Sequence, residues 1–144
     1  MEDGKIALSW QIRPGDVART ERRFLDFIIG GQSLWSSLDT DLISCLGWLP
    51  AEHNADAVLR LLLNAPADFP DDRRSLYICP ECADLGCGAI SVLIERSSDQ
   101  IIWRDFGYQN DYTPEVNRED FDDFPGMTFD AVEYERAIKS ALNI

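Results

Sequence analysis

Hydrophobic and polar residues alternate in several separate stretches of this chain. Ile6, Leu8, Trp10 and Ile12 occupy every second position, which is typical of a strand with one buried face. The same period of two returns from Ile90 onward, and apolar or aromatic runs fill two further stretches. We therefore predict strands near residues 6–12, 76–79, 89–95 and 101–106.

A helical period marks three other stretches. One helix is predicted near Val17–Ile29, with Asp16 as its N-cap and Gly30-Gly31 as its end. The others are predicted near 51–63, after Pro50, and near 131–142, after an N-cap at Asp130. Residues 36–39 and 66–74 are predicted loops, and 42–46 a short strand.

These elements together predict an α+β fold, with a mostly antiparallel sheet packed against about three helices. Residues 1–144 are enough for a single globular domain that buries its own core. No apolar stretch reaches the roughly 18–20 residues of a membrane helix, and the first residues lack the pattern of a secretory signal. We therefore expect a cytoplasmic protein without a membrane partner.

Charge is unevenly distributed along the chain. There are 26 acidic and 13 basic side chains, for a formal net charge of −13, which disfavours direct binding to nucleic acid. Between Asp105 and Glu135 ten acids accompany a single base, Arg118, and aromatic residues are interleaved with them. This mixture suits a surface that binds a basic protein, although solubility and the chain's own core could also account for it. The predicted partner-binding residues are Asp111, Tyr112, Glu115, Glu119, Asp120, Asp122 and Asp123.

Three cysteines lie within nine residues, in Cys79-Pro-Glu-Cys82 and at Cys87. The two-residue spacing lets two thiolates of one turn bind a zinc ion, and Cys87 is near enough to supply a third. A fourth ligand is missing from this stretch, since Cys45 and the one histidine, His53, lie far upstream. We therefore expect buried reduced cysteines and no cofactor, with zinc at Cys79, Cys82 and Cys87 as the alternative.

No complete catalytic constellation is present, so an enzyme is not expected. The chain has no phosphate-binding glycine loop, no Gly-x-Ser-x-Gly and no His-Glu-x-x-His. The exception to test is thiol exchange by Cys79 and Cys82, although glycines and a strand follow this pair where a helix would activate it.

The run Cys79-Pro-Glu-Cys82-Ala-Asp-Leu-Gly-Cys87-Gly-Ala, followed by Ile102-Trp103-Arg-Asp-Phe-Gly-Tyr108-Gln-Asn110, resembles a group of small bacterial proteins sometimes labelled oxidoreductase. That resemblance implies kinship and no mechanism. In size, acidity and lack of catalytic groups the chain is also similar to immunity proteins of bacterial toxin systems, including contact-dependent inhibition. Those proteins neutralise a cognate toxin, frequently a basic nuclease.

The sequence therefore predicts an acidic immunity or inhibitor protein that binds a basic cognate toxin domain. The alternatives are a small thiol oxidoreductase that uses Cys79 and Cys82, and a zinc-stabilised accessory protein.

Overall fold

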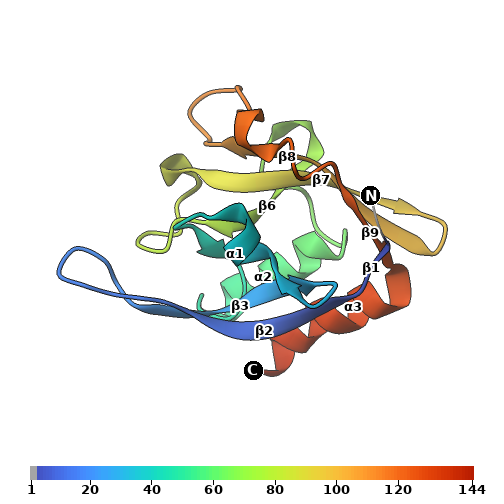
Figure 1. Cartoon of the computed structure of the whole chain (residues 1–144), viewed down its shortest axis with the longest axis horizontal. Helices are drawn as coiled ribbons and strands as arrows, with labels where there is room; N and C mark the ends of the chain where they lie inside the picture. Colours follow the sequence, from blue (N-terminus) through green and yellow to red (C-terminus); the bar gives the residue numbers. More distant parts are fainter. Residues whose placement is uncertain (1–2) are drawn as a thin grey trace.

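The computed structural model describes residues 3–144, which form two β-sheets and the helices packed against them (Figure 1). Within these residues the larger sheet has the order β1 (Asp3–Gly4), β9 (Met127–Asp130), β8 (Gln100–Gln109), β7 (Ala89–Ser97), β6 (Arg73–Ile78), β5 (Ile43–Ser44). Adjacent strands of this sheet are antiparallel, except for β1 and β9, which are parallel to each other. The smaller, antiparallel sheet has the order β2 (Ile6–Arg13), β3 (Arg22–Ile29), β4 (Gln32–Ser33).

The α+β fold with its mostly antiparallel sheet is confirmed. Each of the four predicted strands is present, as β2, β6, β7 and β8, and the short strand predicted within residues 42–46 is β5. The connector predicted over residues 66–74 is wrong at its end. Arg73 and Arg74 already belong to β6, and both are buried.

The helix predicted near Val17–Ile29 is wrong, because residues 22–29 form strand β3. Four consecutive residues, Phe24 through Phe27, are buried, so both faces of this central strand are covered and no alternation remains in the sequence. Asp16 caps no helix; its carboxylate accepts hydrogen bonds from the backbone N–H groups of Ala18 and Arg19 in the loop between β2 and β3. Gly30 and Gly31, both with positive φ, form the two-residue turn to β4.

The buried face predicted for β2 exists only near its start. Ile6 is buried, whereas Trp10 is 37% and Ile12 56% exposed. The loop at the far end of the β2–β3 hairpin projects to the left in Figure 1. In this hairpin Arg22 lies over the Trp48 ring, Arg23 lies over the Trp10 ring, and Arg19 pairs with Asp16.

The α-helices of the described residues are α1 (Leu34–Leu38), α2 (Ala51–Leu61) and α3 (Ala131–Lys139). The loop predicted at residues 36–39 is therefore mostly helical; Ser33 caps α1 by accepting a hydrogen bond from the Ser36 N–H. The N-cap predicted at Asp130 is confirmed, since its carboxylate accepts from the Glu133 N–H at 3.0 Å. No helix within residues 3–144 is long and apolar enough to cross a membrane.

One hydrophobic core joins both sheets. Trp103 of β8 makes edge-to-face contacts with Phe27 of β3, Phe129 of β9 and Tyr134 of α3, at centroid distances of 5.2, 5.0 and 6.0 Å. The sheets are also linked by backbone, because the Leu25 N–H of β3 donates to the Leu46 carbonyl just after β5. The core thus fixes how the loops of the two sheets face each other.

Candidate functional site

Residues 110–126, which we call the acidic segment, connect β8 to β9 and are held in a defined conformation. The sequence showed no clean period here, yet Tyr108 and Asn117 exchange backbone hydrogen bonds at 2.8 Å. Asn110 accepts from the backbone N–H groups of Tyr112 and Thr113, and the Asn117 side chain accepts from the Glu119 N–H. Short polar side chains, which stabilise turns without any periodicity, give this segment its shape.

The single base of the acidic segment is occupied by an internal ion pair. Arg118 donates to the Asp105 carboxylate at 2.6 Å, and the buried Arg73 donates to the same carboxylate at 2.8 Å. The hydrogen bond from Arg118, followed by attraction to Arg73, holds the pKa of Asp105 below its ordinary value. Asp105 itself has a positive φ of 58° at a bulge in β8. Arg118 is therefore not free to neutralise the neighbouring acids.

All seven predicted partner-binding residues are exposed. The six carboxylates, at positions 111, 115, 119, 120, 122 and 123, have no basic partner among the residues that the structure describes. Tyr112, which is 77% exposed, has its ring against Gly86. Gly86 lies in residues 79–88 between β6 and β7, which we call the cysteine turn. The sequence had placed Tyr112 with the acids, whereas the structure also brings it to the cysteines.

The aromatic residues of this region divide between core and surface. Phe106, Phe129 and Tyr134 are buried in the core. Phe121 and Phe124 are half-buried, and the Phe124 ring lies 5.7 Å from Phe106 and 6.4 Å from Phe121. These two rings attach the acidic segment to the sheet and keep its carboxylates at the surface.

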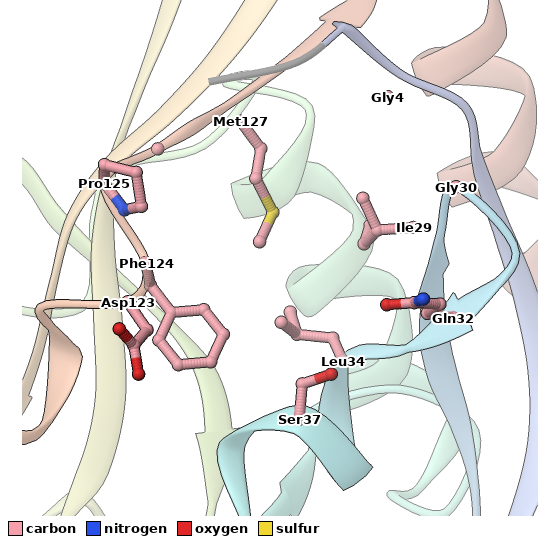
Figure 2. Close-up of a pocket in the computed structure, with 11 residues that line it drawn as sticks. Gly4, Ile29, Gly30, Gln32, Leu34, Ser37, Asp123, Phe124, Pro125 and Met127 are labelled. Atoms are coloured by element: carbon pink, nitrogen blue, oxygen red, sulfur yellow. The ribbon is translucent and has the colours of Figure 1, made fainter.

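A cavity of about 710 Å³ lies beside the end of the acidic segment, between it and the turn that joins β3 to β4. Figure 2 shows Phe124 and Met127 directed into the cavity from one side, with Ile29 and Leu34 opposite them. Polar groups of Gln32, Ser37 and Asp123 stand around these apolar side chains. This combination of an apolar centre with a polar rim is common in binding pockets. The sequence did not indicate this cavity, because its walls come from distant segments.

The three clustered cysteines converge. The Sγ atoms of Cys79, Cys82 and Cys87 all lie within 4.8 Å of one another, and those of Cys82 and Cys87 are 2.8 Å apart. The expectation of buried thiols is wrong for this cluster: Cys82 and Cys87 are exposed and Cys79 is partly exposed, whereas only Cys45 is buried. A hydrogen bond between Cys82 and Cys87 lowers the pKa of Cys82 and raises that of Cys87 to about 12.

The β2–β3 hairpin holds the cysteine turn from outside. Glu81, between the first two cysteines, pairs with the buried Arg13 and accepts hydrogen bonds from the N–H and hydroxyl groups of Thr20. Arg22 donates to the Pro80 carbonyl at 2.8 Å. The Glu81 side chain is therefore engaged with the hairpin. The sequence did not reveal this contact, because the partners are about sixty residues apart.

The Glu81 contact should depend on pH. Hydrogen bonds from Arg13 and Thr20 lower the pKa of Glu81 from 4.5 to about 2. A lowered carboxyl pKa in the folded state stabilises the contact above pH 4.5, and this contribution is lost as the pH falls toward 2. We expect the Thr20 amide to lose protection from hydrogen exchange across this window. Glu81→Gln should remove that pH dependence, and an unchanged profile in this variant would contradict the assignment.

His53 and Arg73 were not among the predicted site residues. His53 of α2 lines a cavity of about 380 Å³ together with Cys82, although 29 positions separate them. The sequence assigned Arg73 to a polar connector. In the structure Arg73 is buried, because it belongs to β6, which pairs with β7. No local pattern could have indicated either placement.

The chain matches no protein-family model, no curated protein and no solved structure.

Proposed function

We propose that this protein acts in the cytoplasm as an inhibitor of the immunity type, which binds and neutralises a basic cognate toxin domain such as a nuclease. The observation that carries the proposal is the row of six exposed carboxylates on the acidic segment, none with a basic partner in residues 3–144. Protein surfaces normally intersperse charges of both signs. Here the single base, Arg118, already pairs with Asp105.

The cavity in Figure 2 adds an apolar centre to this charged surface. Interfaces derive most of their binding energy from a few side chains inserted into desolvated pockets, with charged groups at the rim. Phe124 and Met127 would contact an inserted side chain, while Asp122 and Asp123 remain exposed beside them. A basic protein with a protruding apolar or arginine side chain would complement both features.

Long-range attraction would accelerate this association. A net charge of −13 attracts a basic partner from solution, and salt weakens that attraction. The proposal therefore predicts fast association at low salt, slower association at high salt, and a dissociation rate that depends on the cavity.

Reversing three charges tests the surface. The basic products of genes adjacent to its own would be produced, tested for toxicity with and without this protein, and titrated against it. For Asp120→Lys/Asp122→Lys/Asp123→Lys we expect association slowed by about 10-fold or more at low salt, with a shallower salt dependence. A second variant, Ser37→Trp, narrows the cavity and should mainly accelerate dissociation.

A matched control separates the local surface from net charge. Glu21→Lys/Glu52→Lys/Asp56→Lys alters three other exposed acids and changes the net charge equally. We expect this variant to associate more nearly like the wild type and to protect against the toxin. Equal slowing by both triple variants, or the absence of any neighbouring product that binds, would overturn the proposal.

A further inference from the structure

The cysteine cluster has the geometry of a metal site. A zinc ion bound to sulfur at about 2.3 Å in a tetrahedral arrangement places the sulfur atoms about 3.8 Å apart. The three Sγ atoms here lie within 4.8 Å of one another. Shifts on the order of 1 Å, including a small separation of Cys82 from Cys87, would therefore bring all three to one ion.

Backbone contacts hold the three cysteines in this arrangement. The Ala83 N–H donates to the Cys79 carbonyl at 3.0 Å, and Ala83 takes a positive φ of 57°, which closes the first turn. Asp84 then caps the next turn by accepting from the Gly86 N–H at 2.8 Å, and the Cys87 N–H donates to the Asp84 carbonyl. The cluster is thus built by the fold and does not depend on free rotation of a loop.

The cysteine turn also excludes larger residues at position 88. Gly88 has a φ of 99°, and a Cβ at this position would collide with the Tyr108 ring. Tyr108 in turn donates to the Cys87 carbonyl at 3.4 Å. Together with Glu81 and Arg22 on the hairpin side, Tyr108 positions the turn between β6 and β7 from the other side.

We propose that Cys79, Cys82 and Cys87 bind one Zn²⁺ as thiolates and leave the fourth coordination position to solvent. Clustered thiolates favour zinc over the hard cations that prefer oxygen ligands. No other histidine, cysteine, aspartate or glutamate of residues 3–144 joins this cluster. His53 borders the neighbouring cavity without belonging to the cluster. The proposal of a zinc site does not rest on the proposed inhibitor function.

The test measures metal in the full chain purified under reducing conditions. We expect one zinc per chain by elemental analysis, removal by a chelator, and rebinding of Zn²⁺ or Co²⁺ with thiolate-to-cobalt charge-transfer absorption. The single variants Cys79→Ser, Cys82→Ser and Cys87→Ser should each weaken zinc binding by more than about 100-fold, since even indirect partners of a metal ligand contribute 10- to 100-fold. Cys45→Ala and His53→Gln are controls that should retain zinc.

Alkylation provides a readout that needs no variant. With zinc bound, the three clustered cysteines should resist iodoacetamide, and chelation should expose them while Cys45 stays protected in the core. Circular dichroism should show the fold retained without metal, because the core lies outside the turn. Absence of stoichiometric zinc, an iron–sulfur chromophore, a stable Cys82–Cys87 disulfide, or full affinity in a clustered-cysteine variant would overturn the proposal. Loss of zinc in His53→Gln would indicate that His53 is the fourth ligand, and it would overturn the proposal that solvent occupies this position.

Discussion

Replacing Arg73 by methionine should lower the free energy of unfolding by about 3–5 kcal/mol, the usual effect of removing one partner from a buried ion pair. The Arg73 side chain is only 3% exposed and donates to the Asp105 carboxylate, the Asp105 and Ser91 carbonyls and the Gln109 side chain. Methionine retains the apolar volume but leaves the buried acceptors of Ser91 and Gln109 without this donor. Urea unfolding followed by tryptophan fluorescence would measure the change.

Arg104→Met is the matched control for this prediction. Arg104 of β8 pairs with Glu95 of β7 in the same sheet, but both side chains are about half exposed. An exposed pair contributes about 0–1 kcal/mol, so this variant should remain close to the wild type. A similar decrease in the free energy of unfolding in the two variants would show that the Arg73 network contributes no more to stability than an exposed ion pair. The network matters for the proposed function, because Asp105 also holds Arg118 and so fixes the middle of the acidic segment.

Replacing Asp26 by alanine should be comparably destabilising, by about 3 kcal/mol or more, because several buried donors would lose their acceptor at once. Asp26 is fully buried and accepts from the Tyr77 hydroxyl at 2.7 Å, the Ser33 hydroxyl at 2.5 Å and the backbone N–H groups of Phe27 and Trp35. Through these bonds one carboxylate of β3 links β4 and α1 to β6 of the other sheet.

The measurement for Asp26 is again equilibrium unfolding in urea, with near-ultraviolet circular dichroism as a report on Tyr77 and Trp35. Asp26→Asn, which keeps one acceptor oxygen, should recover part of the loss. Asp56→Ala, an identical change at an exposed position of α2, should stay within about 0.5 kcal/mol of the wild type. If Asp26→Ala also remained within that range, Asp26 would not be the link between the two sheets.

These two buried charged residues explain why the candidate binding surface has a defined shape. Arg73 anchors the strand from which the acidic segment departs. Asp26 fixes Ser33 and Trp35, which flank Leu34 in the wall of the cavity shown in Figure 2. Loss of either residue should therefore disturb partner binding as well as stability.

The sequence by itself determined the elements whose signals are local. Alternation predicted β2 and β7, and apolar or aromatic runs predicted β6 and β8. Capping chemistry at Asp130 predicted the start of α3. The exposure of the predicted acids was also foreseeable, since carboxylates are rarely buried without a partner. The spacing of Cys79, Cys82 and Cys87 indicated a shared zinc site only as the alternative to buried thiols, and the three Sγ atoms converge in the structure.

Only the tertiary structure decided the rest. Residues 22–29 form a strand because both of their faces are covered by distant parts of the chain, and a strand covered on both faces loses the alternation that would identify it. The burial of Arg73 and Asp26 follows from partners contributed by other strands. The cavity, the hairpin contact at Glu81 and the exposure of Cys82 likewise arise where separate segments meet, and no local pattern of residues encodes such a meeting.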